Sequence, residues 1–231
     1  MDFVYICRNG DNEELRYSIR SVVENIPHNN VWLIGGKPKW YSGPYIKYEN
    51  KYGNKFMNIQ DALQVAAKTS DITDDFVYMN DDFFIVHKLE SIPSLRGGLL
   101  KDRIEKSYDM SPSSYYARLL ERTYDYLIKH NITNEPLDYD THIPMVLNKQ
   151  KLAMLKQKQY SIRTIYGNVF NIEAEPMQDV KVYDGGRFKP KSFDEYYKLE
   201  RPFISSTDTS FEDIYNKVLK EMLPNPTIYE S

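Results

Sequence analysis

Cysteine is almost absent from this chain of 231 residues. Cys7 alone cannot form an internal disulfide, and there is no cysteine cluster that could hold structural zinc. No apolar run approaches the roughly 18–20 residues of a membrane-spanning helix, and the mean hydropathy is −0.61. The N-terminal stretch becomes polar after six residues, so we expect no secretory signal. These features favour a protein of the reducing cytoplasm.

Several common enzyme motifs are also missing. The sequence contains no Walker-type glycine-rich loop and no G-x-G-x-x-G after a predicted strand. It has no G-x-S-x-G elbow, no H-E-x-x-H and no protein-kinase motifs. The sequence therefore argues against the commonest NTPase, dinucleotide-binding, hydrolase and zinc-peptidase classes.

The composition is that of a folded, slightly acidic protein. Hydrophobic residues make up 41% and charged residues 27%, which excludes a disordered chain. Thirty basic and 33 acidic residues give a net charge of −3, which argues against extensive wrapping of nucleic acid but permits a local basic groove. The 20 tyrosines suit surfaces that stack on sugars or bases, and a tyrosine-rich core is the alternative explanation.

The first half alternates between predicted strands and helices. Apolar runs predict strands at 3–7, 31–35, 45–48, 76–79 and 83–86, and helical spacing predicts helices at 13–25 and 59–69, the second capped by Asn58. A strand–helix–strand order implies neighbouring parallel strands. We therefore expect an α/β fold with a central, mostly parallel sheet flanked by helices.

The second half has a less regular pattern. We expect a loop over 97–110, helices over 111–130 and 149–158, turns at 166–168 and 184–187, and a C-terminal helix that begins at Ser210 and ends before Pro224. There is no internal repeat and no linker-like composition, so we expect one domain over residues 1–231.

Adjacent carboxylates follow the predicted strand at 76–79. Asp81 and Asp82 come at its carboxyl end, which is where ligands bind in open α/β sheets. Two carboxylates cannot be buried without compensation, and a hard divalent cation is a natural partner. An Asp-Asp turn that caps the next element is the structural alternative.

Three arginines lie near the first predicted strand-to-helix turn. Arg8 follows the strand, and Arg16 and Arg20 share one face of the helix at 13–25. Guanidinium groups suit phosphate oxygens, whereas pairing with glutamates of the same helix is the alternative.

His142 stands in an acidic setting, after Asp138 and Asp140. This setting suggests a role in metal binding or proton transfer, although a lone histidine is often an ordinary surface or core residue.

Several of these segments resemble the Stealth proteins, the sugar-phosphate transferases of capsule and lysosomal-tag synthesis. The block at 14–21, ELRYSIRS, is similar to that family's E-L-R-Y-S-L-R-S, and FVYMNDDFF at 76–84 is similar to its F-x-Y-x-N-D-D-x-F signature. Thr141 to Pro144 falls where that family has a His-x-Pro block. The spacer before Glu14 is shorter than in that family, which indicates a compact relative of phage or bacterial type.

The resemblance implies a GT-A-like nucleotide-sugar fold, with a nucleotide-sugar half at 1–90 and an acceptor-side half with the C-terminal helix at 91–231. It implies that the Asn80–Asp82 segment replaces the D-x-D motif, with Asp82 holding Mn²⁺ or Mg²⁺ and His142 as a later metal ligand. The other residues that it implicates are Arg8, Asn9, Arg16 and Asn80 for the nucleotide and its phosphates, and Asp81, Asp140 and His142 for catalysis.

These inferences predict a metal-dependent glycosyltransferase that moves a sugar from a nucleotide-sugar donor to an acceptor hydroxyl. The acceptor would be a polysaccharide, a wall polymer or a modified DNA base. Transfer of a sugar 1-phosphate is the alternative within enzymes. A non-catalytic module that binds sugar or nucleic acid on the same scaffold is the alternative outside them.

Overall fold

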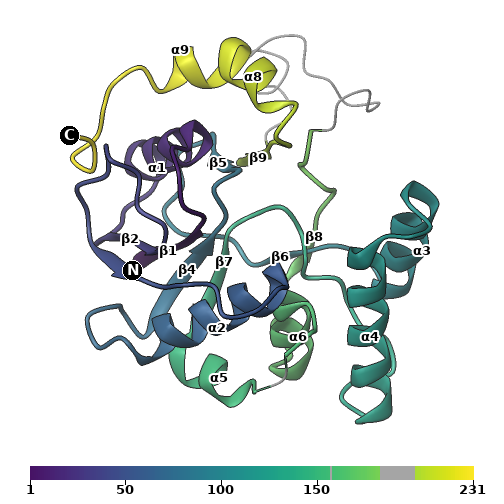
Figure 1. Cartoon of the computed structure of the whole chain (residues 1–231). Helices are drawn as coiled ribbons and strands as arrows, with labels where there is room; N and C mark the ends of the chain where they lie inside the picture. Colours follow the sequence, from purple (N-terminus) through teal and green to yellow (C-terminus); the bar gives the residue numbers. More distant parts are fainter. Residues whose placement is uncertain (157, 183–200) are drawn as a thin grey trace.

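The chain folds around a five-stranded sheet, shown in the computed structural model of Figure 1, which describes residues 1–156, 158–182 and 201–231. The strand order is β3-β2-β1-β4-β7, and only β7 is antiparallel to its neighbour. The strands are β1 (Asp2–Cys7), β2 (Val31–Gly35), β3 (Tyr45–Lys47), β4 (Asp75–Met79) and β7 (Met145–Asn148). The predicted α/β class and the mostly parallel sheet are confirmed.

Helices cover both faces of this sheet, with α1 (Glu13–Asn25) on one side and α2 (Lys55–Lys68) on the other (Figure 1). Because successive side chains of a strand point to opposite faces of the sheet, neighbouring apolar residues of one strand pack against both layers of helices. Phe3 and Tyr5 of β1 pack in the core layer that contains α1, and Val4 between them packs in the layer of α2. This sheet and α1 fix the positions of the loops that follow β1 and β4.

The start of α2 differs from the prediction. Asn54, not Asn58, is the N-cap, since its Oδ1 accepts hydrogen bonds from the backbone N–H groups of Phe56 and Met57. Asn58 lies in the first turn, and its Oδ1 accepts from the N–H of Lys51 and of Tyr52. An asparagine that binds a preceding loop has the same local sequence signal as an N-cap.

Two small sheets join segments that are distant in sequence. β5 (Phe83–Ile85) pairs antiparallel with β9 (Phe203–Ser205), and β6 (Leu95–Arg96) pairs with β8 (Glu175–Pro176). The residues after β4 therefore lie beside the segment that follows residue 200.

The second half contains more helix than predicted. The segment expected as a loop over 97–110 forms α3 (Leu100–Met110), which packs on α4 (Tyr115–Lys129). Only Leu100 and Ser107 of α3 are buried, so its apolar periodicity in the sequence is weak. The expected helix at 149–158 is the shorter α5 (Lys149–Met154).

The turn expected at 166–168 is also wrong, because these residues lie inside α6 (Ile162–Val169). Gly167 is needed there for close packing, since a Cβ at this position would overlap the ring of Tyr139. The turn expected at 184–187 lies outside the described residues.

The C-terminal helix is confirmed. It comprises α8 (Phe211–Ile214), a π-helical segment at Tyr215–Leu219 and α9 (Lys220–Met222). The chain then returns past α1, where Tyr229 stacks on Tyr41 with ring centroids 6.0 Å apart. Among the helices of the described ranges, none combines the length and the apolar character that crossing a bilayer requires.

Candidate active site

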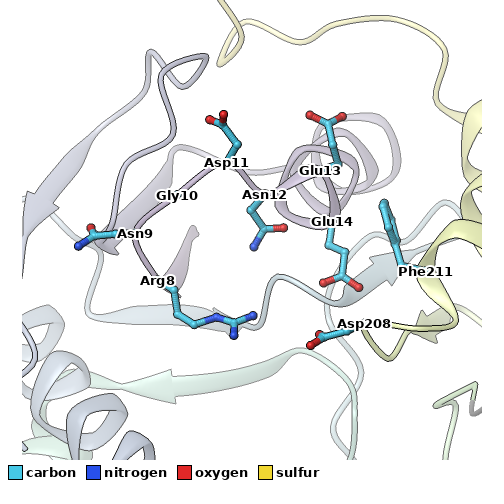
Figure 2. Close-up of a pocket in the computed structure, with 9 residues that line it drawn as sticks. All are labelled: Arg8, Asn9, Gly10, Asp11, Asn12, Glu13, Glu14, Asp208 and Phe211. Carbon is cyan, nitrogen blue, oxygen red and sulfur yellow. The ribbon is translucent and has the colours of Figure 1, made fainter.

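A pocket of about 400 Å³ opens at the carboxyl end of β1, between the loop at residues 8–12 and the start of α8 (Figure 2). Figure 2 shows the side chains of Arg8, Asn12, Glu14 and Asp208 directed towards the same space. The lining residues are Arg8, Asn9, Gly10, Asp11, Asn12, Glu13, Glu14, Asp208 and Phe211.

Asn12 connects this loop to the acidic pair after β4. Its Oδ1 accepts a hydrogen bond from the N–H of Leu15 at 3.0 Å and so caps α1. Its Nδ2 donates to Oδ2 of Asp81 at 2.6 Å. The strand ends of β1 and β4 are thus joined through one side chain, as expected for neighbouring parallel strands.

Asp82 is held by residues of two segments, one that ends at residue 182 and one that begins at residue 201. Nζ of Lys181 donates to Oδ2 of Asp82 at 2.7 Å, and Oγ of Ser205 donates to the same oxygen at 3.0 Å. The N–H of Ser206 donates to the backbone carbonyl of Asp82 at 3.1 Å. The side chains of Lys181 and Asp82 are each 16% exposed, so this ion pair is largely shielded from water.

The site carries negative charge that is only partly compensated. Burial and the charge of Asp82 raise the pKa of Asp81, against the hydrogen bond from Asn12 and the charge of Arg8. Burial also raises the pKa of Glu14, against its hydrogen bond from Ser206, and nearby aspartates raise it further. A cation or a hydrogen-bond donor entering the pocket would be stabilised by these carboxylates.

The structure separates the basic residues of the predicted nucleotide site. Arg8 and Asn9 line the pocket, whereas Arg16 pairs with Glu13 at 3.1 Å and lies over the Trp40 ring at 4.9 Å. Arg16 lines a neighbouring cavity of about 370 Å³ instead. The backbone carbonyl of Asn80 accepts from the N–H of Phe83 at 3.3 Å, in the turn that carries the acidic pair.

Asp140 and His142 belong to a second cluster. Nδ1 of His142 donates to Oδ1 of Asp179 at 2.8 Å, and the N–H of Asp140 donates to Oδ1 of Asp138 at 2.8 Å. Oδ1 of Asp179 also accepts from the N–H of Lys181 at 3.0 Å. Because Lys181 binds Asp82 through its side chain, the two clusters are connected through residues 179–181.

Sequence reasoning missed Glu14, Asp179, Lys181 and Asp208 as site residues. Glu14 stands within the block at 14–21, which is the signal that could have identified it. The other three follow no predicted strand or helix pattern, and tertiary contacts alone bring them to the site.

No group of three or more His, Cys, Asp or Glu side chains within the described residues is placed to hold a metal ion. Mg²⁺ is commonly bound by one or two carboxylates, with substrate phosphates and water completing its shell. The raised pKa values of Asp81 and Glu14 fit a site of that kind, because a divalent cation would relieve their repulsion. The proposed metal roles of Asp82 and His142 stay predictions.

Two capsular polysaccharide phosphotransferases match about two thirds of this sequence. A capsular polysaccharide phosphotransferase of Actinobacillus suis is 25% identical over 173 residues, which is 64% of this chain and 45% of that protein. A capsular polysaccharide phosphotransferase of Actinobacillus pleuropneumoniae is 24% identical over 179 residues, 67% of this chain and 47% of that protein. The matched region thus spans about half the length of each relative. No family model matches the chain.

The fold is similar to that of the bifunctional glycosyltransferase WbbM, with a TM-score of 0.52 at 14% identity. The similarity covers 97% of this chain and 50% of WbbM. At this identity it concerns the fold alone, and it agrees with the predicted GT-A-like architecture. The chain is therefore a distant homologue of the Stealth-type capsular polysaccharide phosphotransferases, with an α/β fold of the GT-A glycosyltransferase kind.

Proposed function

We propose that this protein transfers a sugar 1-phosphate from a nucleotide-sugar donor to a hydroxyl group of a polysaccharide acceptor. The observation that carries the proposal is the homology to two capsular polysaccharide phosphotransferases over about two thirds of the chain. This homology favours transfer of a sugar 1-phosphate, which the sequence left as the alternative, over glycosyl transfer, which was the main prediction. The cytoplasm is the proposed compartment, in keeping with the single cysteine.

In this reaction the acceptor oxygen forms a bond to the phosphorus attached to the sugar. The bond between that phosphorus and the bridging oxygen of the donor diphosphate breaks, and a nucleoside monophosphate leaves. Arg8 and Asn9 line the larger pocket and are the proposed ligands of the diphosphate, where hydrogen bonds to developing charge would stabilise the transition state. Asp140 and His142 are the proposed bases for the acceptor proton.

A divalent cation, Mn²⁺ or Mg²⁺, is the proposed cofactor. When bound, it would supply positive charge to the departing phosphate. Asp81 and Asp82 would hold it, and for Asp82 this requires that Lys181 give up its present ion pair.

Product analysis separates the two kinds of transfer. The purified protein would be incubated with radiolabelled UDP- and GDP-sugars, Mn²⁺ and capsular oligosaccharides, and the nucleotide product identified by chromatography. We expect a nucleoside monophosphate. A nucleoside diphosphate would instead establish glycosyl transfer, and it would overturn the proposal.

A thermal-shift screen separates the transferase from a non-catalytic binding module. A ligand at a hundredfold excess over its dissociation constant stabilises the folded state by about 2.7 kcal/mol. We expect one nucleotide sugar to raise the melting temperature, and Mn²⁺ to increase that shift. A well-folded protein that responds to no nucleotide sugar would favour the binding module.

Asp82→Asn tests the acidic pair directly. We expect turnover to fall by about 10²–10³-fold, since a charge that acts in the transition state is lost. Asp74→Asn, at the opposite end of β4, is the matched control because Asp74 is exposed. Wild-type turnover in Asp82→Asn would remove Asp82 from the mechanism.

A further inference from the structure

A second cavity, of about 190 Å³, lies at the N-terminal end of α3. It shares no lining residue with the larger pocket. Its walls come from the Gly97–Gly98 turn, the first turn of α3, the segment that precedes β7, and the segment that follows β8. Four separate parts of the chain thus enclose one space on the side assigned to the acceptor.

Two residues that line this cavity each have a buried polar side-chain atom without a hydrogen-bond partner among the described residues. Thr141 is 6% exposed, and its Oγ1 has no partner within the part of the chain that the structure describes. Nε of Arg103 is also buried and makes no hydrogen bond to the described residues, although it lies 3.8 Å from Oδ2 of Asp138 and Nη1 donates to Oδ2 of Asp179 at 3.3 Å. Leaving such groups unpaired is unfavourable, so a ligand whose hydroxyl groups reached them would be favoured at this cavity.

The charges around the cavity nearly cancel, since two basic residues, Arg103 and Lys106, and three acidic ones, Asp102, Asp138 and Asp179, line it. The Arg103 guanidinium lies between Asp138, at 3.8 Å from its Nε, and Asp179. Burial, together with repulsion from Asp140, raises the pKa of Asp138 to about 6. Donors and acceptors therefore stand side by side without a large excess of either charge, and Met177 adds an apolar surface. This combination suits a neutral, polyhydroxylated ring better than a phosphate.

We propose that this cavity is a subsite for a neutral sugar unit of the acceptor glycan. The proposal rests on the proposed transfer function and specifies its acceptor side. Asp179 lines the cavity and binds His142, while Lys181, two residues on, binds Asp82. A sugar in the cavity would therefore lie beside the cluster of Asp140 and His142. Residues 179–181 would link it to the acidic pair.

Filling the cavity tests the subsite. Gly98 lines the cavity, and a Cβ there would meet no atom within 4 Å, so Gly98→Leu adds bulk to the cavity wall without a backbone clash. Gly53→Leu is the matched control, since a Cβ at Gly53 also meets no atom within 4 Å and Gly53 lines neither pocket. The probes are the methyl glycosides of glucose, galactose, mannose and N-acetylglucosamine, observed by saturation-transfer difference NMR.

We expect a signal from at least one glycoside with the wild type and with Gly53→Leu, and its loss with Gly98→Leu. An equal signal with Gly98→Leu would overturn the assignment. So would the absence of a signal from every glycoside, or binding of inorganic phosphate in their place.

Thr141→Val gives a second, independent readout. Because the hydroxyl is buried without a partner, its removal should leave the melting temperature unchanged or raise it. Glycoside binding should nevertheless weaken by about fivefold to tenfold, since one hydrogen bond to the ligand is lost. Unchanged glycoside affinity in Thr141→Val would contradict the role given to this hydroxyl.

The two proposals fail in different ways. If wild-type protein binds no nucleotide sugar and makes no nucleoside monophosphate, the transfer function is wrong, whatever the glycosides do. If transfer proceeds normally and Gly98→Leu leaves the KM for the acceptor oligosaccharide unchanged, the subsite is wrong and the transfer function stands.

Discussion

At the scale of single residues, two arginines predicted to bind the nucleotide have different surroundings. Arg8 is exposed and faces the carboxylates of the larger pocket (Figure 2), whereas Arg16 is held by Glu13 and by the ring of Trp40. The alternative of ordinary ion pairing, left open for Arg16 by the sequence, describes its present contacts. Its role at the nucleotide stays a prediction.

Comparing Arg8→Ala with Arg16→Ala resolves this question. We expect Arg8→Ala to weaken nucleotide-sugar binding by roughly 10–100-fold, because hydrogen bonds to charged groups contribute about 1.5–3 kcal/mol. Arg16→Ala should change the affinity by less than Arg8→Ala does. Isothermal titration calorimetry measures both, and an equal loss in the two variants would show that the donor extends into the cavity beside Trp40.

The buried carboxyl of Asp138 gives a prediction about pH. Its pKa is raised from 3.8 to about 6, mainly by burial, so the folded state holds the proton more tightly than the unfolded chain does. Stability from this group is therefore greatest below about pH 4 and is lost as the pH rises to about 6. The full difference corresponds to about 3 kcal/mol.

Urea unfolding at several pH values between 4 and 6 measures this effect. In the wild type, the free energy of unfolding should include a contribution from Asp138 that falls as the pH rises over this range. Asp138→Asn should remove most of this contribution. Asp109→Asn, an exposed change on α3, should retain the wild-type slope. An identical pH dependence in wild type and Asp138→Asn would contradict the assignment.

At the scale of elements, the loop after β1 depends on Gly35 and Gly36 at the end of β2. Cys7 and Gly35 are paired in the parallel ladder, and the N–H of Gly36 donates to the carbonyl of Cys7 at 2.9 Å. A Cβ at Gly36 would overlap backbone atoms of Arg8 and Asn9. The end of β2 thus sets the path of the loop that carries Arg8 and Asn9.

Gly36→Ala should therefore displace that loop. We expect weaker nucleotide-sugar binding and a loss of about 1–3 kcal/mol in the free energy of unfolding, as for other overpacked sites. Gly53→Ala is the control, because its new methyl group meets open space. Wild-type donor affinity in Gly36→Ala would show that the loop adapts without cost to the site.

At the scale of the whole molecule, the C-terminal segment is fastened to α1 by a buried ion pair. Arg20 donates from Nε and Nη2 to the two carboxylate oxygens of Glu230 at 2.8 and 2.7 Å, and from Nη1 to the carbonyl of Leu223 at 3.1 Å. Both side chains of the pair are 9% exposed. This contact joins the last residues to the helix that carries the β1–α1 loop.

Removing one partner should be costly. Glu230→Gln should lower the free energy of unfolding by about 3 kcal/mol, since the Arg20 charge would remain buried without its counter-ion. The double variant Arg20→Met/Glu230→Met should recover much of the loss. Glu221→Gln, on the exposed side of α9, is the control. A double variant that is less stable than Glu230→Gln would contradict this account of the ion pair.

The sequence by itself determined the layered α/β core and the place of the acidic pair. The period of two in β1 and the helical period of α1 are local patterns, and each is fixed by which side chains must leave water. A polar run directly after a buried strand also lies, by necessity, at the end of the sheet where the parallel strands have their carboxyl ends. For these reasons β1, α1, β2, β4 and the position of Asp81 and Asp82 agree with the prediction.

Only the tertiary structure decided which side chains meet there. Lys181 and Asp208 lie 99 and 126 residues beyond Asp82 in the chain, and no periodic pattern links them to it. Local signals also failed where packing overrides them, as at Gly167, which serves close packing on Tyr139 and not a turn. Contacts between distant segments, and the charge balance they create, follow from the folded arrangement because no short stretch of sequence contains both partners.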